Sequence, residues 1–491
     1  MGSRCSGLSL TDVCVFGATG AGVMAAAAAR EAGASIVLVE PGRHVGGMVS
    51  GGLSWTDVGD ARAIGGLARR FYADVAAHYG LPLWGVRGPE PHVAERRLER
   101  LLGGVDVRLE TTEVPEAAVY VDASYEGDLL PRFGVPYAVG RESRELYGEA
   151  WAGRQPAYRP SKHNFAVLLS PFLDDGSLVP FVREPELDGR GWPAEQLGEG
   201  DGALQAYGFR VCLTDRADNR LPWEQPPGYD PARFELLRRY LHAVPEVDPR
   251  SLLGLVPDLL PNGKCDVNSV GPFSLNLLDG SNRGYPDGTQ DARTAIREHH
   301  LRYTQSLLFF LATEDEVPRH VRDELQRWGR CADEFADTDG WPYQLYVRDG
   351  RRMLGEHVLC EDDLLDARPQ PDPVALGSYN VDVREVERTW RYLPEYTRAA
   401  AVFNEGYISL AVQPYPIPYR SLVPRREHAT NLVVPVCLSA SHVAFGSVRV
   451  EPTLMLLGEV AGRAAAEAAR REIAVQDVDV EVARAGQVLA L

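Results

Sequence analysis

A glycine-rich run near the N-terminus carries the residue types that hold a phosphate group. Residues 13–22 read VCVFGATGAG, so an apolar stretch enters a turn that contains Gly17, Gly20 and Gly22. Glycine permits a tight turn and a close helix–strand approach, and the helix that follows presents free N–H groups and the positive end of its dipole to an anion. Thr19 replaces the middle glycine of the strict G-x-G-x-x-G pattern.

A second apolar run ends in an acid at the position that a dinucleotide requires. Residues 36–40 read IVLVE, which places Glu40 close to the ~20 residues that usually separate the glycine turn from a ribose-binding carboxylate. Gly46 and Gly47 follow. Together these residues favour a βαβ unit that binds a dinucleotide over a tight strand–helix turn without a ligand.

His442 is the candidate general base. It lies in the run SASH, in the loop expected between the last strand and the final helix. Imidazole has a pKa suited to proton transfer near neutral pH. A buried histidine that only shapes the loop is the alternative, since the sequence identifies no partner acid.

The elements that must position these residues follow an α/β pattern. Apolar runs predict strands over 10–16, 35–40, 105–109, 117–122 and 431–436, and helical periodicity predicts helices over 20–33, 64–79, 92–102, 231–243, 290–313, 317–328 and 452–471. We expect a Rossmann-like, discontinuous nucleotide-binding domain over 8–150 and 420–491. An inserted α+β substrate domain is expected over 151–419.

Composition excludes several classes of function. The net charge of −18 argues against a nucleic-acid partner, which needs clustered cations. The 7 cysteines contain no C-x-x-C pair, which fits a reducing cytoplasm and argues against a disulfide reductase. We find no secretory leader and no apolar run of the ~18 residues that span a bilayer, so we expect a soluble cytoplasmic protein without a membrane partner. His299-His300 lacks metal-ligand spacing and is expected at the surface, Glu361-Asp362-Asp363 is interpreted as a helix start, and we predict no metal site.

Several motifs resemble a family of bacterial FAD-dependent oxidoreductases whose FAD domain is similar to those of glutathione reductase and fumarate reductase. They are GGMVSGGLSWTD (46–57), YEGD (125–128), PNGKCDVNSVGPFS (261–274), DEFADTDGWPYQLYVRDGRRM (333–353) and VPVCLSASHVAFGSVRVEP (434–452), and the resemblance covers almost the whole chain. It implies non-covalent FAD, because the spacing of His44 does not match that of histidine attachment sites.

The resemblance also implies which residues meet the cofactor. The turn and helix start from Ser447 to Thr453 are expected under the flavin pyrimidine, where a helix N-terminus stabilises the negative charge of reduced flavin. The expected FAD-binding residues are Gly17, Thr19, Gly20, Ala21, Gly22, Glu40, Pro41, Arg43, Gly46, Gly47, Met48, Val114, Ala123, Ser124, Gly446, Ser447, Glu451, Pro452 and Thr453.

Two departures from the family pattern bear on function. Relatives carry a β-hairpin between the positions of Val114 and Ala117, where this chain has only Pro115-Glu116. Relatives tend to have Ser-His where this chain has Val383-Arg384, so if that histidine contacts the substrate in relatives, this chain has a different substrate.

The chemistry implied is oxidation of a small molecule. We find no second glycine-rich turn for a nicotinamide cofactor, so we expect a hydride to pass from the substrate to flavin N5 in a dehydrogenase or oxidase reoxidised by oxygen or an electron carrier. A hydroxylated sugar, cyclitol or glycoside-type natural-product intermediate is the leading substrate class. An amine oxidase or desaturase, and a degenerate flavoprotein with a binding or structural role, are the alternatives.

The expected substrate contacts lie in two segments. Tyr419 and Arg420 follow a proline-rich stretch, and Gln344, Tyr346 and Arg348 alternate along an expected strand, which would place them on one face. A polar, solvent-facing side of a sheet is the alternative for the second group.

Overall fold

A parallel sheet is assembled from both ends of the chain. The computed structural model describes residues 11–86, 88–156, 161, 163–185, 196–268, 270–393 and 399–491. The sheet has the order β19-β4-β1-β2-β3 and consists of β1 (Thr11–Phe16), β2 (Ile36–Val39), β3 (Asp106–Arg108), β4 (Ala117–Asp122) and β19 (Leu432–Val433). Its pairings are all parallel, which confirms the predicted α/β class with a Rossmann-like sheet.

The last strand is shorter than the predicted range 431–436. Only Leu432 and Val433 pair with β4. The amide of Val434 instead donates to the carbonyl of Leu422 (2.8 Å), and Pro435 has no N–H with which to continue a ladder.

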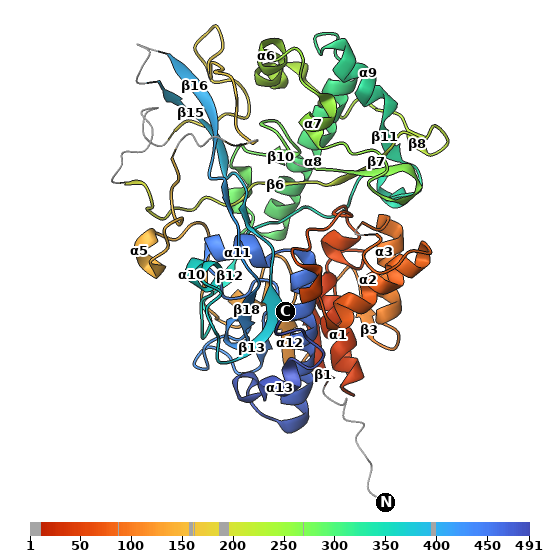
Figure 1. Cartoon of the computed structure of the whole chain (residues 1–491), viewed down its shortest axis with the longest axis vertical. Coiled ribbons are helices and arrows are strands. Elements are labelled where there is room, and N and C mark those ends of the chain that lie inside the picture. The colour runs from red at the N-terminus through yellow and green to blue at the C-terminus, as the bar shows by residue number, and fades with distance from the viewer. Residues whose placement is uncertain are drawn as a thin grey trace, which may run out of the picture.

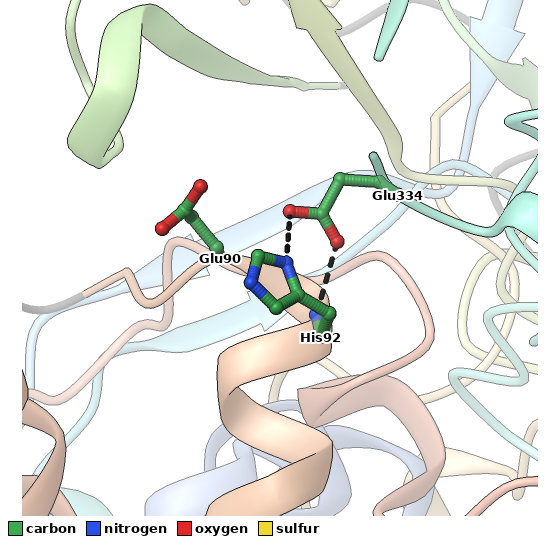
Figure 2. Close-up of side chains that lie close together, drawn as sticks. All are labelled: Glu90, His92 and Glu334. Carbon is green, nitrogen blue, oxygen red and sulfur yellow. Dashed lines mark hydrogen bonds and ion pairs between the residues drawn. The ribbon is translucent and has the colours of Figure 1, made fainter. Parts of the chain in front are cut away.

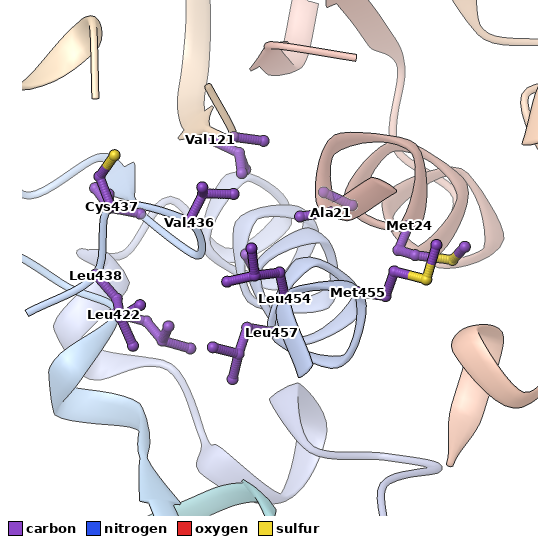
Figure 3. Close-up of a cluster of buried hydrophobic side chains, with 14 of the residues drawn as sticks. Ala21, Met24, Val121, Leu422, Val436, Cys437, Leu438, Leu454, Met455 and Leu457 are labelled. Carbon is purple, nitrogen blue, oxygen red and sulfur yellow. The ribbon is translucent and has the colours of Figure 1, made fainter. Parts of the chain in front are cut away.

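Two helices from opposite ends of the sequence pack closely beside this sheet. They are α1 (Gly20–Glu31) and α12 (Glu451–Arg471). Figure 3 shows Met24 of α1 beside Met455 of α12, and both side chains are fully buried. The predicted helices over 64–79 and 92–102 are confirmed as α2 (Gly66–His78) and α3 (Pro91–Leu101).

The middle of the chain forms a second hydrophobic core at the other end of the molecule (Figure 1). An antiparallel sheet of order β8-β11-β7-β9 contains β7 (Val211–Thr214), β8 (Arg220–Leu221), β9 (Lys264–Val267) and β11 (Gly329–Cys331). Its helices are α6 (Glu235–Ala243), α7 (Pro249–Leu253), α8 (Gln290–Thr313) and α9 (Arg319–Arg327), which confirms the helices expected in this region.

The remaining strands form short antiparallel pairs. They are β5 (Tyr137–Ala138) with β12 (Arg352–Met353), β6 (Tyr207–Gly208) with β10 (Asn276–Leu277), β13 (Pro373–Gly377) with β18 (Tyr415–Pro418), β14 (Val381–Val383) with β17 (Ile408–Leu410), and β15 (Glu387–Tyr392) with β16 (Ala400–Glu405). The short helices are α4 (Leu129–Arg132), α5 (Arg144–Tyr147), α10 (Glu361–Leu365), α11 (His442–Val448) and α13 (Val480–Ala483). The helix start predicted at Glu361 is confirmed as α10.

Three further expectations concern the segment after β3, the position of His300 and membrane-spanning helices. The segment between β3 and β4 contains no hairpin, as the sequence predicts. His300 is fully buried in α8, so its expected place at the surface is wrong; desolvation lowers its pKa to about 4. Among the described residues, no helix is both long and apolar enough to cross a bilayer.

Candidate functional site

The glycine turn between β1 and α1 has the geometry that only glycine satisfies. Gly17 has φ +93°, and a Cβ there would lie 2.7 Å from the amide nitrogen of Ser124. A Cβ on Gly22 would lie 1.9 Å from the carbonyl oxygen of Gly17. The turn therefore requires glycine at both positions, for conformation at the first and for close approach at both.

Thr19 has a structural reason to occupy the place of the middle glycine. Its hydroxyl accepts a hydrogen bond from the amide of Gly22 (3.1 Å) and donates one to the carbonyl of Ala123 (2.8 Å). The threonine is thus the N-cap of α1 and also ties the turn to the end of β4.

A cavity of about 480 Å³ opens at the carboxyl ends of the parallel strands. Gly17, Glu40 and Ser124 follow β1, β2 and β4, and all three line it. In open α/β sheets this edge is where ligands bind, at the point where the strand order reverses. The other lining residues are Thr19, Pro41, Gly42, Arg43, His44, Gly47, Tyr125, Glu126, Asp128, Tyr285, Gln290, Arg293, Thr294, Arg297, Asp337, Thr338, Tyr343, Gln344 and Leu345.

Glu40 is held rigidly at the edge of this cavity. One carboxylate oxygen accepts from the amide of Ala18 (2.7 Å) and the other from the amide of Gly42 (2.7 Å). Burial raises the pKa of Glu40, while these two hydrogen bonds oppose that change. Each carboxylate oxygen keeps a lone pair for a further donor.

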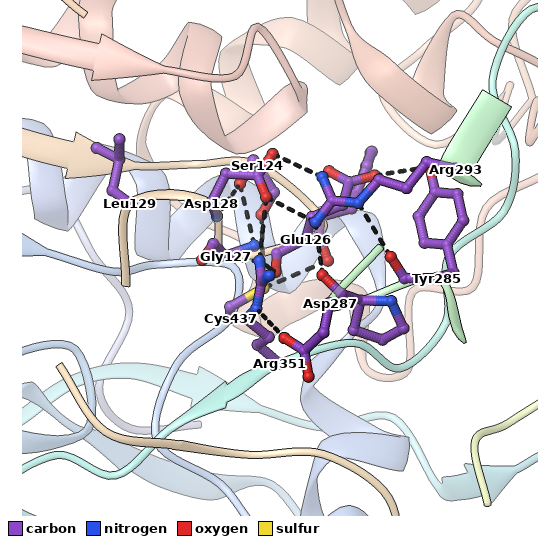
Figure 4. Close-up of polar contacts among 12 residues, drawn as sticks. Ser124, Glu126, Gly127, Asp128, Leu129, Tyr285, Asp287, Arg293, Arg351 and Cys437 are labelled. Atoms are coloured by element: carbon purple, nitrogen blue, oxygen red, sulfur yellow. Dashed lines mark hydrogen bonds and ion pairs between the residues drawn. The ribbon is translucent and has the colours of Figure 1, made fainter. Parts of the chain in front are cut away.

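An ionic network supports the opposite wall (Figure 4). Arg293 contacts Asp128 through two parallel hydrogen bonds of 2.8 and 3.0 Å, and Arg351 reaches the same carboxylate at 3.0 Å. The hydroxyl of Ser124 accepts from the amide of Asp128 (3.1 Å). Nearby, burial and the charge of Asp128 raise the pKa of Glu126 to about 7. This bidentate pairing fixes the turn after β4 against α8.

Tyr125 separates the large cavity from a small second one. Its hydroxyl donates to Oε1 of Glu451 (2.6 Å) and accepts from the amide of Met48 (2.9 Å). Both cavities are lined by Tyr125, and the second also by Tyr346, Val347, Arg348, Asp349, Gly350, Val436, Phe445, Arg449, Glu451 and Leu454.

A third cavity, of about 260 Å³, lies next to the second and is lined almost entirely by polar groups. Tyr346, Arg348 and Arg449 border both. The remaining lining residues of this third cavity, called the polar cavity below, are Asp57, His163, Arg210, Asn268, Val270, Tyr379, Asn380, Asp382, Arg384, Tyr407 and Ser409. Neighbouring cavities therefore share lining residues, in a row that leads from the glycine turn to the polar cavity.

Comparison with known proteins decides the cofactor. The model of the family described as FAD dependent oxidoreductase matches residues 12–116 and 105–486. The chain belongs to this family. FAD is therefore its cofactor.

Solved structures match only a part of this oxidoreductase. The FAD-bound OTEMO structure is 18% identical over 23% of this chain and 25% of its own, with a TM-score of 0.16. A steroid monooxygenase bound to NADP is 16% identical over the same shares, with a TM-score of 0.16. Thioredoxin reductase from T. acidophilum is 14% identical over 23% of this chain and 34% of its own, with a TM-score of 0.15. The match thus spans about a quarter of the length of the OTEMO and steroid monooxygenase chains. No curated protein matches it.

The residues around the large cavity fit an FAD. A Cβ at Gly17 or Gly22 would collide with the backbone of the turn or of the end of β4, so the glycines keep the turn tight beside the cavity, and Glu40 lines the same cavity. Of the residues predicted to bind FAD, seven line the cavity: Gly17, Thr19, Glu40, Pro41, Arg43, Gly47 and Ser124. Gly20, Ala21 and Gly22 form the first turn of α1, Gly46 and Met48 flank Gly47, and Ala123 lies behind Gly17.

The other predicted FAD contacts lie farther from the large cavity. Glu451 lines the second cavity, and Pro452 and Thr453 follow it in the first turn of α12. Gly446 and Ser447 belong to α11, which ends at Val448, and α12 begins at Glu451, so the turn and helix start expected from Ser447 to Thr453 are present between these two helices. Val114 lies half-buried in the segment between β3 and β4.

His442 is the first residue of α11, rather than a loop residue. Its Nδ1 lies 2.7 Å from Oδ2 of Asp349, the partner acid that the sequence did not identify. The side chain is 1% exposed, and its Nε2 has no hydrogen-bond partner among the described residues. His442 itself lines none of the three cavities. Its partner Asp349 lines the second cavity, and so does Phe445, which lies one helical turn after His442 in α11.

The predicted substrate contacts separate into three places. The strand expected through residues 344–348 is wrong, because only Tyr346 forms a single bridge, to Gly208. Tyr346 and Arg348 nevertheless line the polar cavity, while Gln344 lines the large one.

Tyr419 and Arg420 line none of the three cavities. The hydroxyl of Tyr419 donates to the carbonyl of Val475 (2.8 Å), and Arg420 pairs with Asp372 (3.1 Å). Sequence reasoning missed Asp57, Arg210 and Arg449 as cavity residues, although the departure from the family pattern at Arg384 was a signal for this site.

Glu90, His92 and Glu334 form a cluster of metal-binding residue types outside these cavities (Figure 2). The ammonium group of Lys264 lies 2.6 Å from both Glu90 and Glu334, and Nδ1 of His92 lies 2.8 Å from Glu334. The buried ammonium group of Lys264 already supplies a cation to these carboxylates, so the cluster is explained as a structural ion network.

Proposed function

We propose that this FAD-dependent oxidoreductase oxidises a polar small molecule held in the polar cavity. The observation that carries the proposal is the row of cavities, in which Tyr346, Arg348 and Arg449 border both the polar cavity and the small cavity next to Tyr125. When bound, FAD would accept a hydride at N5 and pass the electrons to oxygen or to an electron carrier, so the chain acts as a dehydrogenase or oxidase.

The residues of the glycine turn would hold the cofactor. The N-terminus of α1 offers amides to the pyrophosphate, and Glu40 offers its remaining lone pairs to ribose hydroxyls. The N-terminus of α12, at Glu451 to Thr453, would face the flavin end together with Met48. Gly446, Ser447 and Val114 complete the proposed set. In this view 8–150 and 420–491 bind FAD, and 151–419 supplies most of the substrate contacts.

The lining of the polar cavity supports a hydroxylated substrate. Tyr379, Tyr407 and Ser409 are neutral groups that both donate and accept hydrogen bonds, as hydroxyl recognition requires. We therefore propose a sugar, cyclitol or glycoside, in a natural-product pathway. The four arginines of the cavity disfavour a cationic amine, since like charges repel in a site of low dielectric.

His442 is the proposed proton acceptor for the substrate hydroxyl. Asp349 would hold its ring in one orientation, leaving Nε2 as the acceptor, which is the usual arrangement of a general base and its orienting acid. Asp57 is the second candidate, because it lines the polar cavity itself. Burial raises the pKa of the Asp57 carboxyl, and this change moves the pKa toward the pH range of a useful base.

Anaerobic mixing of the FAD-loaded protein with a panel of sugars, cyclitols and amines tests this proposal. The flavin absorbance band near about 450 nm should bleach with a hydroxylated compound and persist with the amines. His442→Ala should slow bleaching by about 100-fold or more if His442 is the base, and Asp57→Asn should do so if Asp57 is. Bleaching by amines alone would favour the amine oxidase. A purified protein that holds no flavin would favour a binding or structural role.

A further inference from the structure

Arg348 is a buried charge without an acidic partner. Its side chain lies beside the polar cavity and the residue is 4% exposed. One guanidinium nitrogen donates to the carbonyl of Ala206 (2.6 Å), and the group lies 4.0 Å over the ring of Tyr346. Among the described residues, no carboxylate forms an ion pair with it, whereas buried charges in proteins are normally paired.

Three further arginines border the same chamber, and each is paired with a carboxylate, of which Asp382 also lines the cavity. Arg210 contacts Asp266 at 2.9 Å, Arg449 contacts Asp382 at 3.5 Å, and Arg384 contacts Glu385 at 3.4 Å. Arg449 also donates to the hydroxyl of Tyr346 (2.8 Å). These pairs compensate three of the four positive charges and leave that of Arg348.

The positive surroundings act on Arg348 itself. Burial, together with the charges of Arg384, Arg449 and Arg210, lowers the pKa of Arg348 to about 9. An anion placed in the cavity would relieve this repulsion and supply the missing partner. Asp57 is the remaining carboxylate at the cavity, besides the three that pair with arginines. Burial raises the pKa of Asp57 and so disfavours its charged form, although the charges of Arg210 and Arg449 oppose this change.

We infer that the polar cavity binds an oxyanion, a carboxylate or phosphate group carried by the substrate, with Arg348 as its principal partner. The inference rests on the proposed function, because it names the chemical class of the molecule that this cavity holds. Guanidinium groups suit such a ligand, since their planar donors match a carboxylate or phosphate in pairs. Tyr379, Tyr407 and Ser409 line the same cavity, where their hydroxyls can meet the neutral part of the same molecule.

Three sugars that share one ring and differ at one carbon provide the test. The oxidised, FAD-loaded protein is titrated with glucose, glucuronate and glucose 6-phosphate, and binding is measured by calorimetry under nitrogen. We expect glucuronate or glucose 6-phosphate to bind at least about 30-fold more tightly than glucose, because removing one partner of a buried charge pair costs about 2 kcal/mol or more. The tighter of the two identifies the carboxylate or the phosphate as the recognised group.

Variants assign the effect to this arginine. Arg348→Gln should abolish the preference for the anion, and Arg348→Lys should restore part of it. Arg388→Gln is the matched control, because Arg388 is also buried without an ion pair among the described residues, but it packs over Phe273 away from the polar cavity. The wild-type comparison of the three sugars needs no variant, so a variant that fails to fold does not affect it.

The outcomes separate this inference from the proposed function. Equal affinity for all three sugars, or an anion preference that survives in Arg348→Gln, would overturn the inference. Flavin bleaching by neutral polyols without any anion preference would leave the proposed function standing. Tight anion binding without bleaching by any sugar would support the inference and count against the proposed oxidation.

Discussion

Glu451 is a carboxyl group held in a position where its charge is costly. It is the first residue of α12 and is 3% exposed; Tyr125 donates to one of its oxygens, and the other has no hydrogen-bond partner among the described residues. Burial raises the pKa of Glu451 to about 7. The folded protein therefore favours the protonated form relative to the unfolded chain.

Glu451→Gln tests this residue through the pH dependence of stability. An acid whose pKa is raised on folding contributes its full stability below the unfolded pKa of about 4.5 and loses it as pH rises to about 7. The neutral amide of glutamine does not titrate, so it does not lose this stability, and its oxygen can still accept the hydrogen bond from Tyr125. We expect the variant to gain on the wild type between pH 5 and pH 7.5, by up to about 3 kcal/mol, with no further change above.

Melting temperatures measured across that pH range provide the readout. Glu316→Gln, at an acid whose side chain is 55% exposed, is the control and should show no such trend. Parallel pH profiles for wild type and Glu451→Gln would contradict the account.

Contacts at the level of single residues were the hardest to predict. Glu40 and the glycines were found because their roles depend on short-range spacing. Asp349 was missed as the partner of His442, because a distant segment brings the two together. Thr19 looked like a departure from the glycine pattern, although its bond to Ala123 explains it.

At the scale of elements, the contact between α1 and α12 joins the two ends of the chain. A Cβ on Gly458 would lie 2.1 Å from the carbonyl oxygen of Ala21, and a Cβ on Gly462 would lie 2.1 Å from that of Ala25. The two glycines lie on one face of α12, one turn apart, and let its backbone reach α1. This contact fixes the N-terminus of α12 relative to the glycine turn.

Gly458→Ala should destabilise the protein despite the higher helix propensity of alanine. The new methyl group forces α1 and α12 apart in a packed region, which costs about 1–3 kcal/mol, and FAD affinity should fall as the two helix N-termini separate. Chemical denaturation and FAD titration measure the two effects. Gly202→Ala, where a Cβ meets nothing within 4 Å, is the control. Unchanged stability in Gly458→Ala would show that the helices tolerate the separation.

Elements with a strong local pattern were predicted well, and those held by distant contacts were not. The periodicity of α8 and α12 gave their bounds to within a residue or two. The segment 344–348 alternates like a strand, yet only Tyr346 forms a bridge there. Its alternating side chains instead line different cavities, Gln344 the large one and Tyr346 and Arg348 the polar one. No local sequence rule distinguishes this arrangement from a strand.

At the scale of the whole molecule, the site is a row of three cavities built from segments far apart in sequence. The large cavity uses both the glycine turn and α8, and the polar cavity uses Asp57, Arg210 and Arg449. The family resemblance predicted the first of these and the cofactor. Of the polar cavity, only Tyr346 and Arg348 were predicted as substrate contacts, because its four arginines lie in separate loops and turns that only the fold brings together.

The central claim is that the substrate is oxidised from the polar cavity, and the rate of anaerobic flavin reduction tests it most directly. The compound that bleaches the wild-type protein is mixed at a concentration below saturation with Arg348→Gln and with Arg388→Gln, each loaded with FAD. We predict bleaching at least about 30-fold slower in Arg348→Gln and within about 3-fold of wild type in Arg388→Gln. Wild-type rates in Arg348→Gln would contradict the claim and place the substrate elsewhere.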